Sequence, residues 1–99
     1  MILKVKRLDA SGGGWKYIDN IKRIITREIT EDEFDEKTSI DKNRGDIDFA
    51  IIDDYNKNKS MQCICTINDN GKEKHIDVIF NTPAYLCNDE GQTIEKLIR

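Results

Sequence analysis

The sequence predicts a mainly β fold, a small antiparallel sheet or partly open barrel of about five to seven strands that leaves room for one short helix. Two observations predict it. Short β-like runs recur along the chain between turn residues, and Asn70-Gly71, the favoured dipeptide of a two-residue hairpin turn, lies in the middle of residues 61–80. At 99 residues the chain has room for a single domain over residues 1–99.

The hairpin over residues 61–80 is the clearest element. When Asp69 pairs with Lys72 across the turn, one face of the hairpin becomes nearly all apolar. The pairs on that face are Met61 with Phe80, Cys63 with Val78, Cys65 with Ile76, and Ile67 with Lys74. The opposite face is mostly polar, as expected of an antiparallel sheet with one face in water.

A second hairpin is predicted at the end of the sequence. Asp89-Glu90-Gly91 can form a three-residue loop in which Gly91 takes a positive φ. Asn88 then pairs with Gln92, and Leu86 with Ile94. A short final helix over residues 92–98 is the alternative.

The first half of the chain is less regular. Residues 2–8 and 46–52 are β-like. Residues 15–30 fit a helical period and a strand period, and their β-branched residues favour the strand. On such a strand Ile21, Ile25 and Ile29 share a face with Arg23 and Arg27.

Residues 30–45 are strongly acidic. Thr30 followed by Glu33 forms a capping-box pattern that allows a short helical turn, but the segment offers little apolar surface to offset ordering, so a mobile acidic loop over residues 31–45 is favoured. The simpler interpretation of this loop is a solvated excursion. The functional interpretation is an acidic limb that binds a basic surface on a partner protein through Glu31, Asp32, Glu33, Asp35 and Glu36.

A glycine cluster follows the first β-like run. It matches neither the dinucleotide nor the P-loop pattern, so a turn is favoured over a phosphate cradle. Exposed N–H groups beside aromatic and basic residues suit stacking and charge pairing with a nucleotide-like anion. The ligand-binding residues of this hypothesis are Gly12, Gly13, Gly14, Trp15, Lys16, Tyr17, Arg23 and Arg27. The alternative for Trp15 is a place in the core.

Charge and composition limit the partners. The net charge is −3 and the pI is about 5.1, which argues against long nucleic acids. Residues 1–29 hold seven Lys/Arg and three Asp/Glu, giving +4 there and −7 in residues 30–99, so the basic third suits a small anion. The apolar fraction of 37% is low against a typical value of about 45–50%. The core is therefore thin or completed by a second copy, and we expect a homo-oligomer.

The sequence shows no catalytic or metal-binding pattern. His75 lies opposite Thr66 on the polar hairpin face, without a partner at triad spacing. The three cysteines lack the spacing of a zinc site and are interpreted as small core residues. We expect no catalytic residue, no metal, no cofactor and no enzyme activity. Without a leader-like start or a membrane-length apolar run, we also expect a cytoplasmic protein with no membrane partner.

The segment Tyr85–Glu95 resembles the endings of small, uncharacterised phage and prophage proteins of low-GC Gram-positive bacteria. The residues that carry the resemblance are Tyr85, Leu86, Cys87, Asn88, Asp89, Gly91, Thr93, Ile94 and Glu95. Such proteins include inhibitors of nucleases and sponges for cyclic-nucleotide signals, so the resemblance implies binding rather than chemistry.

Three functional hypotheses follow. The first is a module that sequesters an anionic small molecule in the host cytoplasm. The second is an acidic inhibitor that docks on a host nuclease or defence effector. The third is a structural or regulatory phage accessory protein.

Overall fold

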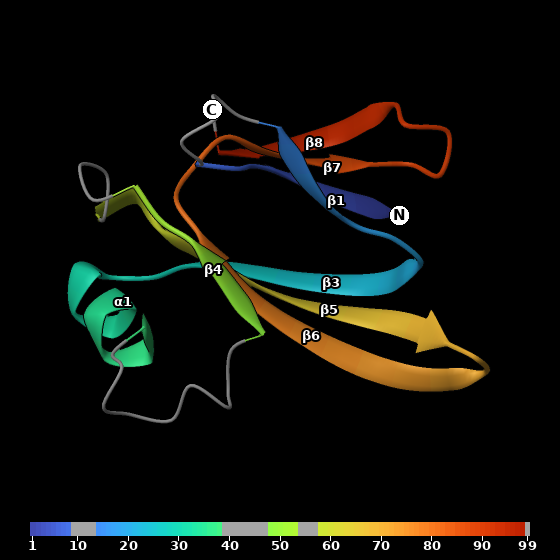
Figure 1. Ribbon diagram of the computed structural model, residues 1–99, viewed down its shortest axis with the longest axis horizontal. Coiled ribbons are helices and arrows are strands. Elements are labelled where there is room, and N and C mark those ends of the chain that lie inside the picture. The colour runs from blue at the N-terminus through green and yellow to red at the C-terminus, as the bar shows by residue number, and fades with distance from the viewer. Residues whose placement is uncertain (9–13, 39–47, 54–57, 99) are drawn as a thin grey trace.

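The computed structural model describes residues 1–8, 14–38, 48–53 and 58–98. Within these ranges, eight strands form two four-stranded sheets, and one short helix lies beside the second sheet (Figure 1). The mainly β prediction is therefore confirmed. The strands outnumber the five to seven expected, and the two sheets stay open instead of closing into a barrel.

Each sheet combines strands from both halves of the chain. The first has the order β2-β1-β7-β8, formed by Trp15–Ile18, Ile2–Lys6, Ala84–Cys87 and Thr93–Ile98. The second has the order β3-β5-β6-β4, formed by Ile21–Glu28, Met61–Asp69, Lys72–Phe80 and Phe49–Ile51. All neighbours are antiparallel except β4 and β6, which are parallel.

The main core lies between the sheets, because both contribute to one cluster of buried side chains. That cluster consists of Leu3, Val5, Ile18, Ile21, Cys63, Cys65, Val78, Phe80 and Ala84. A smaller cluster of Ile29, Phe34 and Ile79 fixes the helix α1, Glu31–Thr38, to the second sheet.

The β5–β6 hairpin has the predicted register. Met61 pairs with Phe80, Cys65 with Ile76 and Asp69 with Lys72. Asn70 and Gly71 both have positive φ, 52° and 83°, as a type I′ turn requires. The register that places the hairpin's apolar face in the core is thus confirmed.

The β7–β8 hairpin is confirmed at its turn and wrong beyond it. Gly91 has φ 86°, and the Asn88 N–H donates to the Gln92 carbonyl at 2.9 Å, as predicted. A register shift between Leu86 and Cys87 then places Leu86 opposite Glu95 instead of Ile94. Ile94 is consequently 56% exposed. The strand also excludes the alternative helix over residues 92–98.

Residues 15–28 are β, as the β-branched composition favours, but they form two strands in different sheets. The chain crosses between the sheets at Asp19 and Asn20, where Asn20 takes φ 60°. A register shift between Ile21 and Arg23 then breaks the expected common face. Ile21 is buried in the core, whereas Ile25 is 67% exposed.

The acidic segment is helical where the structure describes it. The Glu33 N–H donates to the Thr30 Oγ1 at 3.1 Å, so the capping-box interaction from Thr30 is present. The loop interpretation is wrong over Glu31–Thr38, because burial of Phe34 against Ile29 and Ile79 supplies the apolar contact that composition alone did not reveal. Residues 39–45 of the predicted mobile loop lie outside the described residues.

All three cysteines are free and buried, as expected of core residues. Burial raises the pKa of the Cys63 thiol to about 12 and that of Cys65 to about 11, with smaller electrostatic contributions, including one from Asp77 at both thiols. Both thiols are therefore protonated at neutral pH, and neither is an activated nucleophile.

The hairpin register generates a stability prediction. Cys65→Asp places a carboxylate on the buried face and should lower the free energy of unfolding by about 3 kcal/mol or more. Asn68→Asp, on an exposed position of the same strand, is the matched control and should change it by less than about 0.5 kcal/mol. Denaturant unfolding measures both, and equal stabilities would contradict the register.

Candidate functional site

The outer face of the first sheet gathers lysine and aromatic side chains. On β1, Leu3 and Val5 are fully buried in the core. Lys4 and Lys6 alternate with them along the strand, so their side chains point to the outer face of the sheet. Strand pairing brings aromatic residues to this side. Lys6 is opposite Trp15 and Lys4 is opposite Tyr17 on β2, while Lys4 is also opposite Tyr85 on β7. We call Lys4, Lys6, Trp15, Tyr17 and Tyr85 the lysine–aromatic face.

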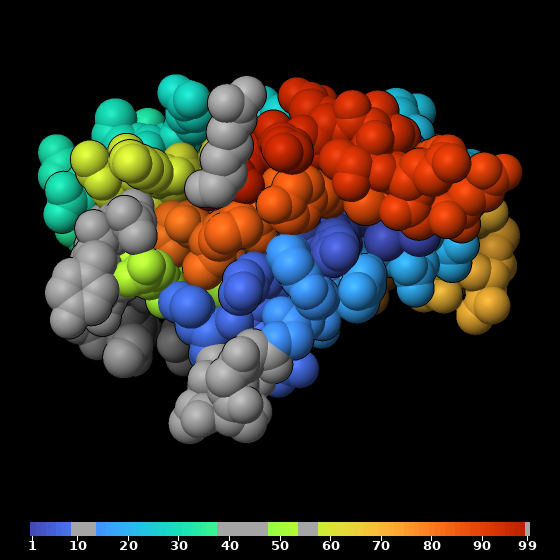
Figure 2. Space-filling model, turned by 90° about the horizontal axis from the view of Figure 1, so that it is seen from above, coloured from blue at the N-terminus to red at the C-terminus, as the bar shows by residue number. Residues whose placement is uncertain are grey.

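The strands that carry this face lie side by side on one surface of the molecule. Figure 2 shows β1 in dark blue, β2 in lighter blue, and β7 and β8 in orange to red, adjoining one another in the view from above. Lys96, on β8, is exposed and pairs with Tyr85. It places another ammonium group beside the face.

Lys4 is the centre of the lysine–aromatic face. Its Nζ lies 4.2 Å from the centroid of the Trp15 ring and 5.9 Å from that of Tyr85. The two rings contact each other with centroids 5.8 Å apart and planes tilted by 58°. Lys6 Nζ is 5.9 Å from the Trp15 centroid. These distances are those of cation–π and edge-to-face contacts.

The face combines aromatic ring surface with positive charge that has no acidic partner among the residues that the structure describes. Trp15 is partly exposed and outside the core clusters, and Tyr17 is 53% exposed. Within the described part of the chain, neither Lys4 nor Lys6 forms an ion pair. Rings offer stacking to a planar group and ammonium groups offer charge-assisted hydrogen bonds to an oxyanion. The arrangement therefore suits an anion with a planar ring.

Lys16 lies on the opposite side of β2 from Trp15 and Tyr17. Its Nζ is 5.3 Å from the Phe49 ring centroid, and it borders a hollow of about 600 Å³ with Arg7, Leu8 and residues 49–52. The predicted trio of Trp15, Lys16 and Tyr17 is thus divided between two surfaces, because successive strand residues face opposite ways.

Arg23 and Arg27 belong to the second sheet and have partners there. Arg23 forms an ion pair with Glu73 at 3.6 Å. Arg27 donates to Glu33 at 2.8 Å and, through Nε, to the Gln62 side chain at 3.1 Å. The structure therefore does not bring these two arginines together with the lysine–aromatic face.

Only one glycine of the predicted loop is described. Gly14 has φ 126°, and its carbonyl accepts a hydrogen bond from the Arg7 N–H at 3.0 Å. This hydrogen bond joins the end of β1 to the start of β2, so Gly14 belongs to the connection between the two strands. Gly12 and Gly13 lie outside the described residues.

The acidic residues of the second hypothesis lie on α1. Glu33 accepts from Arg27, and this hydrogen bond lowers the pKa of the Glu33 carboxyl below its usual range. Glu31, Asp32 and Glu36 are exposed. Phe34, between them in sequence, is buried. The helix therefore presents carboxylates to solvent while one side chain anchors it.

Sequence reasoning missed Lys4, Lys6 and Tyr85. The alternation of Leu3 and Val5 with Lys4 and Lys6 was a usable signal, because it assigns the lysines to the outer face. The place of Tyr85 had no local signal, since it depends on β1 pairing with β7 across most of the chain.

The described residues contain no obvious centre for chemistry. No group of three or more His, Cys, Asp or Glu side chains among them is arranged to hold a metal ion. His75 is exposed, and its Nδ1 lies 3.2 Å from the Thr66 Oγ1, the neighbour expected from the register. None of the described helices has the length and apolar character needed to cross a membrane.

Comparison with known proteins gives no match to a family model, to a curated protein or to a solved structure.

The position of Trp15 generates a prediction for its fluorescence. Trp15 is the single tryptophan of the chain, so its emission reports on the lysine–aromatic face alone. Iodide should quench it, and Lys4→Met should lower the quenching constant by roughly twofold at low salt, because the ammonium that attracts iodide is removed. Lys72→Met, at the distant hairpin turn, is the control. Blue-shifted emission that iodide does not quench would place Trp15 in the core and contradict the geometry.

Proposed function

We propose that this protein is a non-enzymatic binding protein that sequesters a nucleotide-like anionic small molecule on the lysine–aromatic face. The observation that carries the proposal is the Lys4 ammonium group, which lies within cation–π distance of the rings of both Trp15 and Tyr85. The base of a nucleotide would stack on an exposed ring, and its phosphate would be held by Lys4 and Lys6. Lys96 extends the positive charge along the same surface.

A small ligand fits the charge of the protein better than a long polymer does. The net charge of −3 would repel an extended nucleic acid, whereas the lysine side of the first sheet is locally positive. Stacking of a base on an aromatic side chain contributes about 1–3 kcal/mol. Two lysines add a contribution that salt should weaken.

The biological setting is part of the same proposal. The resemblance of Tyr85–Glu95 to phage proteins supports an origin in a phage and a role in the host cytoplasm, where sequestration of a nucleotide signal would counter a host defence. The low apolar fraction supports a homo-oligomer. Edge strands of the two sheets each expose an isoleucine, Ile25 on β3 and Ile94 on β8. A second copy of the chain would cover these apolar side chains.

Calorimetric titration with linear and cyclic nucleotides tests the ligand class. Trp15→Ala should weaken binding by about 1–3 kcal/mol through loss of stacking. Lys4→Met and Lys6→Met should weaken it more at low salt than at high salt, because they remove charge.

Arg23→Met is the matched control, since Arg23 is an exposed cation on the other sheet, and it should leave nucleotide binding unchanged. Absence of nucleotide binding by the parent protein would refute the proposal. An effect of Arg23→Met as large as that of Lys4→Met would refute the assignment of the face.

The second candidate is an acidic inhibitor of a host protein, and the exposed carboxylates of α1 favour it. The helix is fixed by the burial of Phe34 and by the ion pair of Glu33 with Arg27. The exposed carboxylates of Glu31, Asp32 and Glu36 therefore form a stable surface. Such a surface is complementary to a basic groove on a nuclease or defence effector. A structural or regulatory phage accessory role has no observation in its favour here.

If the acidic candidate is right, one variant should lose binding to the host protein and keep its thermal stability. Combining Glu31→Gln, Asp32→Asn and Glu36→Gln keeps Phe34 and the Glu33 ion pair, so the melting temperature should stay within a few degrees of the parent. Binding to a host protein isolated with the parent chain should fall at least tenfold. Glu90→Gln with Asp69→Asn, at the hairpin turns, is the charge control. Unchanged affinity of the α1 variant would remove this candidate.

A further inference from the structure

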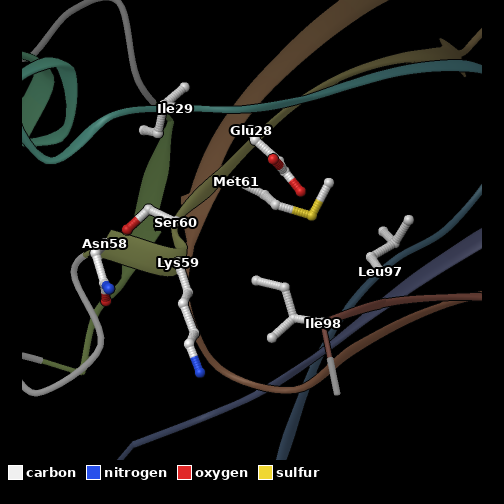
Figure 3. Close-up of a pocket in the computed structure, with 8 residues that line it drawn as sticks. All are labelled: Glu28, Ile29, Asn58, Lys59, Ser60, Met61, Leu97 and Ile98. Carbon is white, nitrogen blue, oxygen red and sulfur yellow. The ribbon is translucent and has the colours of Figure 1, made fainter.

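A separate hollow opens between the two sheets, away from the lysine–aromatic face. It is lined by the end of β3, by the chain entering β5 and by the end of β8, and has a volume of about 370 Å³ (Figure 3). The lining residues are Glu28, Ile29, Asn58, Lys59, Ser60, Met61, Leu97 and Ile98. It therefore joins segments from both sheets.

The hollow exists because β3 and β8 are edge strands. Each is the outermost strand of its sheet, so no strand covers the gap between them within the described residues. Met61, Leu97 and Ile98 pack against the main core but are only partly buried. They form an apolar floor that continues the core to the surface. At one end, the Ile29 N–H donates to the Ser60 carbonyl at 3.1 Å and closes the wall.

Two side chains of opposite charge line the hollow beside its apolar floor. Glu28 and Lys59 are exposed, and neither forms an ion pair with another side chain in the described ranges. In the view of Figure 3, the two side chains come from different walls, with the apolar side chains of Met61 and Ile98 drawn between them. An occupant with an apolar body and two opposite charges would satisfy the floor and both walls.

We propose that this hollow binds a small zwitterion with an apolar body, the chemical class of aliphatic and sulfur-containing amino acids. The ammonium group of the ligand pairs with Glu28, its carboxylate pairs with Lys59, and its side chain covers Met61, Leu97 and Ile98. The volume is at the low end of the range of about 300–1,000 Å³ for small-molecule sites, which favours a ligand of this size. Met61 adapts to different side chains because its thioether is unbranched and flexible.

The test follows the methyl resonances of Met61, Leu97 and Ile98 by NMR while L-leucine or L-methionine is added to the full chain. Two analogues separate the charges. 4-Methylpentanoate is leucine without its ammonium group, and 3-methylbutylamine is leucine without its carboxylate. Leucine should shift these resonances, and each analogue should bind about fivefold more weakly, the effect of one exposed ion pair.

Variants assign each charge. Glu28→Gln should weaken leucine about fivefold and leave 4-methylpentanoate unchanged, while Lys59→Met should weaken leucine and leave 3-methylbutylamine unchanged. Glu90→Gln and Lys72→Met, at the two hairpin turns, are matched controls. All four side chains are exposed, so the variants should fold. The proposal would be overturned if neither amino acid shifted these resonances at tens of millimolar. It would also be overturned if leucine bound equally well to Glu28→Gln, to Lys59→Met and to the parent.

Discussion

The complete burial of Leu3 and Val5 is the constraint on which the candidate site depends. Successive residues of a strand face opposite sides, so burial of these two side chains fixes Lys4 and Lys6 on the outer surface. Because β1 is a central strand with β2 on one side and β7 on the other, its register also fixes what lies next to the lysines. The positions of Trp15, Tyr17 and Tyr85 follow from hydrogen bonding to a strand whose orientation the core decides.

Hydrogen bonds where the chain passes from β6 to β7, between the two sheets, keep that register in place. Asn81, buried at the end of β6, exchanges hydrogen bonds with Asp53 at 2.6 Å through both its Oδ1 and its Nδ2. The Thr82 Oγ1 donates to the Lys6 carbonyl at 2.7 Å, and the Lys6 N–H donates to the Pro83 carbonyl at 2.9 Å. These contacts satisfy polar groups that the crossing would otherwise leave buried without partners. The two contacts of Lys6 also hold the end of β1 against the chain that enters β7, the strand that carries Tyr85.

What the sequence could predict was local. The β5–β6 register follows from one turn and from alternation over its two flanks, and both are visible within residues 61–80. The turn of the β7–β8 hairpin was predictable for the same reason. Its register beyond the turn was not, because the shift at Leu86 and Cys87 has no turn residue to mark it. The fold of residues 15–28 into two sheets depends on Asn20, which takes the left-handed conformation that asparagine tolerates well.

The candidate site was harder to predict because its parts are distant in sequence. Trp15 and Tyr17 were recognisable as a possible stacking pair, but their basic neighbours come from β1 across a strand pairing and not from the residues next to them. Lys16 is separated from them by the pleat. The choice between a loop and a helical turn in the acidic segment was hard to make, because one phenylalanine, Phe34, supplies most of the apolar contact of α1. A single buried residue gives no periodic signal.

The basic residues of β3 have an explanation in the fold that does not require a ligand. An eight-residue edge strand with free backbone groups is prone to pair with another chain, and charged side chains and bulges are the usual protection. Lys22 and Arg23 are near Glu73, and the register shift between Ile21 and Arg23 twists the start of the strand. Arg27 joins Gln62 to Glu33 and so fixes α1 to the sheet; Gln62 in turn donates to Asp77 at 2.9 Å.

The two lysines of β1 have no such explanation, because β1 is a central strand and its cations contact rings instead of carboxylates. That difference is the reason why the proposed ligand is assigned to the positive charge of the first sheet and not to that of the second.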